Sequence, residues 1–129
     1  MKLIDTDVVI DHFHGHQAAF DYFAATLASG EVLAISVVTL TELTSGMRSG
    51  EEERTERLLS LFTILDVSTP MGRLAGAFIR QYRLSHRIEL GDALIAATAV
   101  IANADLVTRN VRHYPMPDIR VVMPYERGR

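Results

Sequence analysis

Residues 2–13 read KLIDTDVVIDHF, and this stretch indicates how the fold begins. Its first part, residues 2–5, is short and apolar and predicts a strand. The pattern that follows predicts a helix, with Thr6 or Asp7 as the residue that caps it. Asp5 therefore lies at the carboxyl end of a strand, which is where the sites of open α/β sheets are found.

Strands and helices are expected to alternate along the rest of the chain. Further strands are predicted at residues 32–36, 63–67, 105–108 and 120–123, helices at residues 17–28, 39–47, 51–62, 69–86 and 91–103, and a helical turn at 110–114. This order predicts an α/β three-layer sandwich, with a central, mainly parallel sheet of four to five strands flanked by helices. No repeat or linker divides the sequence, so residues 1–129 are expected to form a single domain.

The composition narrows the classes of function. The chain has 129 residues, no cysteine and a formal net charge of −3. Without cysteine there is no disulfide and no thiolate ligand, which fits a reducing compartment. The start of the chain lacks the pattern of a secretion signal, and the longest apolar run, residues 93–102, is too short to cross a membrane. We therefore expect a soluble, cytoplasmic protein, and the negative charge argues against a simple electrostatic nucleic-acid binder.

Three acids that are far apart in the sequence, Asp5, Glu42 and Asp92, lie where the fold can bring them to one edge of the sheet. At an effective dielectric constant of 20, two carboxylates ~5 Å apart repel each other by roughly 3 kcal/mol. A bound divalent cation offsets such repulsion, so the pattern favours a metal site. Each residue alone also has a simpler explanation, because Asp5 and Asp92 can cap helices and Glu42 can be an exposed helix residue.

Four stretches resemble the successive motifs of PIN domains, and specifically of VapC-like toxin ribonucleases from type II toxin–antitoxin systems. These stretches are LIDTDVVID at 3–11, TLTELTSG at 39–46, GDALIAATA at 91–99 and LVTRNVRHY at 106–114. The resemblance implies a PIN-like fold, a Mg²⁺ or Mn²⁺ cofactor, and endoribonuclease activity on phosphodiester bonds of structured RNA. It also implies a cognate antitoxin as partner and a homodimer.

Carried over position by position, the resemblance implies that the catalytic residues are Asp5, Glu42, Asp92 and Asn110, with Asp5 and Asp92 as the metal ligands. Many relatives have an acid where this chain has Asn110, so a weaker or single-metal site becomes more plausible. Arg109 and Arg112 flank Asn110 and are the expected contacts to RNA phosphates. Small polar residues next to the acids are suited to hydrogen bonds that orient them or to turns: Thr6, Ser36 and Thr108.

Arginines also recur in the helix predicted at residues 69–86 and just beyond it. Arg73, Arg80 and Arg87 are seven residues apart, and Arg83 lies close by, so all four are expected on the outer face of the helix. They form either a surface that tracks an RNA backbone or an ordinary solvated face.

Two other functions remain open from the sequence. A receiver domain that accepts a phosphoryl group has a similar length and an acidic metal pocket, but it needs a lysine after its last strand, and the only lysine here is Lys2. A catalytically weak or inactive PIN module that binds RNA or protein is the other alternative, and Asn110 in place of an acid motivates it.

Overall fold

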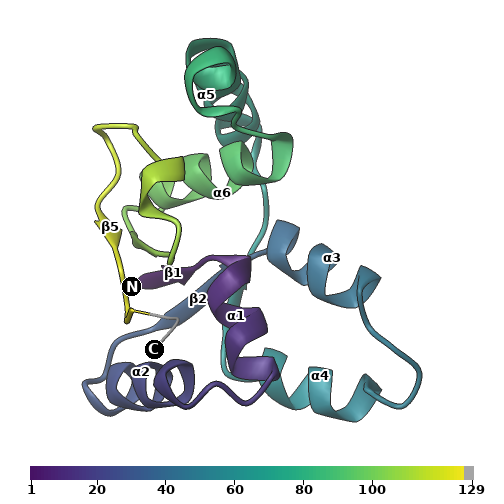
Figure 1. The fold of residues 1–129 in the computed structure, drawn as a ribbon. Coiled ribbons are helices and arrows are strands. Elements are labelled where there is room, and N and C mark those ends of the chain that lie inside the picture. The colour runs from purple at the N-terminus through teal and green to yellow at the C-terminus, as the bar shows by residue number, and fades with distance from the viewer. Residues whose placement is uncertain (127–129) are drawn as a thin grey trace.

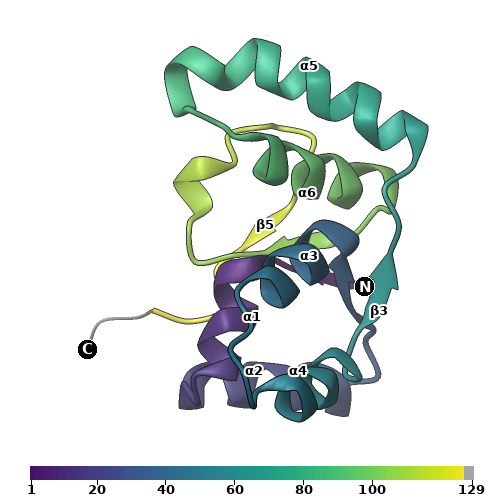
Figure 2. The same cartoon turned by 90° about the vertical axis from the view of Figure 1, so that its right-hand side faces the viewer.

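The computed structural model describes residues 1–126, and within them the chain forms one five-stranded sheet with helices on both faces (Figures 1 and 2). The strands are β1 (Lys2–Ile4), β2 (Leu33–Ser36), β3 (Thr63–Leu65), β4 (Asp105–Val107) and β5 (Val121–Val122). They lie in the order β3-β2-β1-β4-β5, and every neighbouring pair is parallel. The predicted α/β class is confirmed.

The helices follow the strands in the predicted alternation. They are α1 (Thr6–Phe13), α2 (Gln17–Ala28), α3 (Val37–Ser45), α4 (Glu52–Leu59), α5 (Thr69–His86) and α6 (Leu90–Ile101), and a short 3-10 helix, η1, covers Val111–His113. The bounds of α2 and α5 agree with the prediction. Helix α3 begins two residues earlier than expected, because the Ser36 hydroxyl accepts a hydrogen bond from the Val38 amide at 3.0 Å and caps it there.

Successive side chains of the buried strands point alternately into two hydrophobic cores, one on each face of the sheet. In β1, Leu3 belongs to the core under α5 and α6, whereas Ile4 belongs to the core under α1, α2 and α4. Figure 1 shows α5 and α6 on one side of the sheet and α1, α2 and α4 on the other. This is the three-layer arrangement that the sequence predicts.

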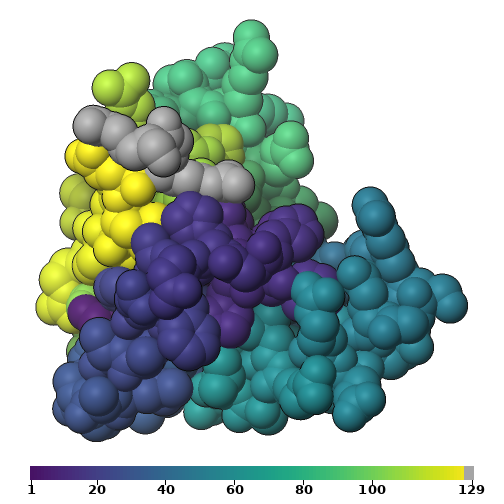
Figure 3. All heavy atoms as spheres, turned by 60° about the horizontal axis from the view of Figure 1, so that its bottom comes forward, coloured from purple at the N-terminus to yellow at the C-terminus, as the bar shows by residue number. Residues whose placement is uncertain are grey.

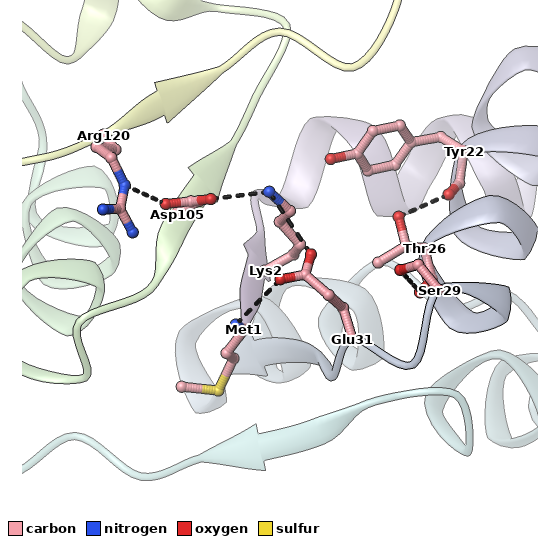
Figure 4. A network of polar contacts seen from close by, with 8 residues as sticks. All are labelled: Met1, Lys2, Tyr22, Thr26, Ser29, Glu31, Asp105 and Arg120. Atoms are coloured by element: carbon pink, nitrogen blue, oxygen red, sulfur yellow. Dashed lines mark hydrogen bonds and ion pairs between the residues drawn. The ribbon is translucent and has the colours of Figure 1, made fainter.

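An ion-pair network connects neighbouring segments at the amino edge of the sheet (Figure 4). The Lys2 ammonium lies 2.8 Å from one Asp105 carboxylate oxygen, and Nε of Arg120 lies 2.5 Å from the other. Glu31 adds longer contacts to Lys2 and to the amino group of Met1. The network therefore ties together the starts of β1 and β4 and the segments before β2 and β5.

The strand order reverses at β1, because β2 and β3 lie on one side of it and β4 and β5 on the other. In open parallel sheets such a switch point leaves a crevice at the carboxyl ends of the two strands that meet there, β1 and β4. In residues 1–126, no helix is both long and apolar enough to span a lipid bilayer.

Candidate active site at the carboxyl edge of the sheet

Asp5 follows β1 directly and points into the switch point. It is the N-cap of α1, in place of Thr6 or Asp7, because its Oδ1 accepts a hydrogen bond from the Thr6 amide at 2.8 Å. Its Oδ2 accepts two further hydrogen bonds, from the hydroxyls of Thr108 and Tyr114, both at 2.9 Å. Only 6% of Asp5 is exposed, so this carboxyl group is held by protein donors rather than by water.

Asp92 reaches the same place from α6. It lies in the first turn of that helix, whose N-cap is Glu89, so Asp92 is not itself the cap. Its Oδ1 lies 3.5 Å from the Tyr114 hydroxyl, and its Oδ2 lies 2.8 Å from Nε2 of His113. The Tyr114 hydroxyl therefore contacts both Asp5 and Asp92, and the structure brings the two predicted metal ligands together.

Glu42 approaches this pair from α3. The Thr6 hydroxyl donates to its Oε1 at 2.6 Å and also shares a hydrogen bond with Thr39 at 2.9 Å. A Cβ atom placed on Gly91, the residue before Asp92, would lie 3.9 Å from Oε2 of Glu42. The Glu42 carboxylate thus lies between the first turns of α1 and α6, so all three predicted acids converge.

Two of the three small polar residues bond to the acids as the sequence suggested. Thr6 holds Glu42, and Thr108 holds Asp5. Ser36 instead caps α3. The other explanation, a bond to the local backbone, applies to Ser36 and also to Thr108, whose hydroxyl accepts from the Asn110 amide.

Asn110 has a different environment from the three acids. Its backbone amide donates to the Thr108 hydroxyl at 3.0 Å, but its exposed side chain forms no hydrogen bond with residues 1–126. A further acid, Asp7, lies closer to the site, because its Oδ2 accepts from the Arg109 amide at 3.2 Å and lies 3.5 Å from the Thr108 hydroxyl. The catalytic role of Asn110 stays a prediction.

Two residues that contact the acids, His113 and Tyr114, are not among the predicted site residues. Both belong to the LVTRNVRHY stretch, which also contains the predicted site residues Arg109, Asn110 and Arg112. The signal in the sequence was a histidine and a tyrosine shortly after the strand predicted at residues 105–108. Their contacts with Asp5 and Asp92 arise because η1 turns the chain back beneath the start of α6.

The two arginines predicted to contact phosphate differ in availability. Nε of Arg109 lies 2.7 Å from Oδ2 of Asp11, a carboxylate that is only 3% exposed. The Tyr125 hydroxyl donates to the same oxygen at 2.8 Å. Arg112 is exposed and forms no ion pair with any residue in the described part of the chain. Arg112 is therefore the freer of the two to bind a phosphate.

The site carries negative charge that the chain only partly compensates. Burial, followed by the nearby Asp7 carboxylate, raises the pKa of Asp5 to about 6, and the hydrogen bonds from Tyr114, Thr108 and Thr6 oppose this effect. Burial also raises the pKa of Asp7, against the opposing charge of Arg109. Burial and the surrounding carboxylates raise the pKa of Tyr114 far above its ordinary value, so its hydroxyl is a neutral donor.

The donor set fits a hard divalent cation. Within residues 1–126, no three His, Cys, Asp or Glu side chains are arranged to hold one ion together. Mg²⁺ commonly binds proteins through one or two carboxylates and keeps several waters. Asp5 and Asp92 supply such a pair, and a bound cation would offset the burial that raises the pKa of Asp5.

The chain is similar to known proteins over most of its length. A PIN domain family model matches residues 2–118. The chain is 43% identical over 122 residues to Ribonuclease VapC19 of Mycobacterium tuberculosis, which covers 93% of this chain and 98% of that protein. For Ribonuclease VapC10 of the same species the identity is 46% over 117 residues, covering 90% and 87%. A toxin-antitoxin complex from Klebsiella pneumoniae matches with a TM-score of 0.79 at 34% identity, covering 98% of this chain and 99% of that one. The chain belongs to the PIN domain family.

Proposed function

We propose that this protein is the ribonuclease toxin of a toxin–antitoxin module. It hydrolyses phosphodiester bonds in structured RNA, in the cytoplasm, with a Mg²⁺ or Mn²⁺ ion held by Asp5 and Asp92. The observation that carries the proposal is the convergence of Asp5, Glu42 and Asp92 at the switch point of the sheet. The similarity to two proteins named as ribonucleases supports the reaction class.

Each residue of the site has its own role in the proposed reaction. When bound, the ion supplies positive charge for the phosphate oxygens and lowers the pKa of water. Thr108 and Tyr114 hold the Asp5 carboxyl group in one orientation, and His113 does the same for Asp92. Glu42, held by Thr6, is exposed and so can accept a proton from the attacking water. The exposed side chains of Arg112 and Asn110 can bind the substrate.

Cleavage of RNA by the purified protein tests this function. Structured RNA is incubated with the protein and Mg²⁺ or Mn²⁺, and the new ends are mapped by primer extension. We expect discrete cuts that stop when EDTA is added and that Asp92→Asn removes while the circular dichroism spectrum stays unchanged. RNA that is bound but never cut by the wild-type protein would support the alternative of a non-cutting PIN module.

We further propose that an antitoxin segment lies in the groove between α1, α3 and α4. The groove has a volume of about 870 Å³ and an apolar lining that includes Ile10, Phe13, Leu43 and Met47. Glu42 lies in the same lining, so a segment bound there reaches the active site and meets its negative charge. Figure 3 shows α1 in purple next to the α4 region in teal on this side of the molecule. An amphipathic helix with a basic residue near Glu42 fits this groove.

The groove and the active site can be separated by mutation. Met47 lines the groove and is 36% exposed. Met47→Asp is expected to weaken antitoxin binding, measured by calorimetry, because it buries a charge, while the cleavage rate of the free toxin stays unchanged. Antitoxin binding of wild-type strength would argue against this groove.

We also propose that the protein forms a homodimer through the start of α6. Leu90, the first residue of this helix, is 65% exposed. Burial of such an apolar side chain against a second copy is favourable. Light scattering is expected to give a dimer for the wild type and a monomer for Leu90→Glu.

A further inference from the structure

Helix α5 and the residues beside it have a charge pattern unlike that of the rest of the chain. Residues 67–88 contain four arginines and neither aspartate nor glutamate. This stretch has a formal charge of +4, so the remaining residues carry −7 of the total of −3. We name its arginines, Arg73, Arg80, Arg83 and Arg87, the α5 arginine stripe.

The stripe lies on one face of the outermost helix. The arginines in α5 are spaced by seven and three residues, which brings them to the same side. The opposite side, with Met71, Ala75 and Phe78, is buried in the core that α5 shares with α6. Figure 2 shows α5 lying lengthwise over α6, with its far side uncovered.

The arginines of the stripe have no partners of their own. All four are exposed, and none forms an ion pair or a side-chain hydrogen bond with residues 1–126. Arg57, Arg109 and Arg120, in contrast, each form an ion pair with an acid. The charge of the stripe is therefore available to a ligand.

Arg87, the last residue of the stripe, has an unfavourable backbone conformation. It is the C-cap of α5 with φ 52° and ψ 37°, in the left-handed region where glycine is usual. A residue with a Cβ atom is destabilised there by about 1 kcal/mol. The other non-glycine residue with positive φ in the described chain is Asn103, and asparagine tolerates this region well. A strained residue of this kind points to a role other than local stability.

We infer that the α5 arginine stripe binds the phosphate backbone of the RNA substrate and leads it toward the acid site. The inference rests on the proposed ribonuclease function. Fourteen residues separate Arg73 from Arg87, which corresponds to about 21 Å along a helix. The stripe ends at the connection to α6, whose first turn carries Asp92. Guanidinium groups suit phosphate because they donate paired hydrogen bonds and stay charged.

Salt dependence of RNA binding tests the stripe apart from cleavage. A labelled single-stranded RNA oligonucleotide is titrated with the protein in EDTA, so that no cutting occurs, at several NaCl concentrations. Each phosphate contact to a single strand contributes about 0.7 to the slope of log K against log salt. Arg80→Gln/Arg83→Gln is expected to lower the slope by roughly 1.4. The control Arg48→Gln/Arg57→Gln removes two exposed arginines outside the stripe, of which Arg57 pairs with Glu53, and should leave the slope unchanged.

Arg87→Gly separates binding from folding. Glycine fits the left-handed backbone, so the unfolding temperature is expected to stay level or rise while the slope falls by about 0.7. Equal slopes for stripe and control variants would overturn the inference. So would stripe variants that bind RNA normally but lose antitoxin or self-association, because the stripe would then be a protein interface.

The cleavage assay with Mg²⁺ distinguishes the two levels of the proposal. If the wild type cuts RNA but the stripe variants keep the wild-type slope, only the stripe fails. If the wild type neither binds nor cuts RNA, the ribonuclease function and the stripe fail together.

Discussion

The acids at the two edges of the sheet have different partners, and their pKa values are shifted in opposite directions. At the amino edge, Asp105 lies between the Lys2 ammonium and the Arg120 guanidinium, and its pKa falls mainly because of the hydrogen bond from Lys2 (Figure 4). At the carboxyl edge, Asp5 is held by two hydroxyls and an amide, and its pKa rises to about 6 because it is buried.

The difference separates a structural acid from a functional one. The chain supplies cations to Asp105, so that acid stabilises the sheet. At the other edge the Arg109 guanidinium is directed to Asp11. The partners of Asp5 are two hydroxyls and an amide, and those of Asp92 are the Tyr114 hydroxyl and the His113 imidazole, which leaves room for a cation from outside the chain.

Exchanging each acid for its amide gives the largest expected contrast. Asp5→Asn is expected to lower the rate of RNA cleavage by more than roughly 100-fold, because it removes a proposed ligand, whereas effects of 10–100-fold are typical of residues behind a ligand. Asp105→Asn should leave the rate within about twofold. Initial cleavage rates at saturating Mg²⁺ measure both. Similar losses of cleavage rate in the two variants would contradict the assignment of Asp5 as functional and Asp105 as structural.

Asp5→Asn, which is expected to lower activity, should raise the stability of the metal-free protein. Because the folded pKa of Asp5 exceeds the ordinary 3.8, the folded state binds more protons, and its stability falls as the pH rises from about 4 to about 6. Asp5→Asn removes this penalty and is expected to raise the free energy of unfolding by up to about 3 kcal/mol at pH 7.5. Urea unfolding in EDTA measures it, and the gain should vanish at pH 4. A pH-independent effect would contradict the assignment.

Two tyrosines that donate to buried acids form a matched pair. Tyr114→Phe removes the hydroxyl shared by Asp5 and Asp92, and is expected to weaken Mn²⁺ binding by about 10–100-fold. Tyr125→Phe removes a hydroxyl bonded to Asp11, outside the proposed ligands, and should leave the Mn²⁺ affinity unchanged. Calorimetric titration compares the two. Equal affinities would mean that Tyr114 does not position the ligands.

The smallest effect is expected at the amino edge. Asp105→Asn should lower the free energy of unfolding at pH 7 by about 1 kcal/mol, the upper range for partly exposed ion pairs. Because the folded pKa of Asp105 lies below 3.8, its contribution is present above that pH and is lost as the pH falls through the folded pKa. High salt should reduce the difference. A larger loss at low pH than at neutral pH would reverse the proposed sign.

Much of the fold follows from local signals in the sequence. Ser29 and Gly30 end α2, and Pro70 opens α5, so both helices match their predicted bounds. The order of strands and helices also predicted that Asp5, Glu42 and Asp92 meet, although only Asp5 directly follows a strand and Asp92 lies in a helix that follows another helix. The N-cap of α1 was harder, since three successive polar residues fit that position.

The contacts behind the acids depend on neighbours that sequence spacing does not reveal. Tyr114 meets Asp5 across 109 residues, and this requires the path that the chain takes after β4. Arg109 pairs with Asp11 of α1 rather than remaining free for phosphate, and no local pattern links these two residues. Periodicity therefore identified the edge and its acids, whereas the hydrogen bonds that orient them required the structure.

Anomalous diffraction from crystals grown with Mn²⁺ tests the central claim most directly. The account predicts a manganese peak beside the carboxylates of Asp5 and Asp92 in the wild type and in Asp105→Asn, and no peak there in Asp5→Asn. An empty carboxyl edge at high Mn²⁺ concentration, or a peak that persists in Asp5→Asn, would contradict it.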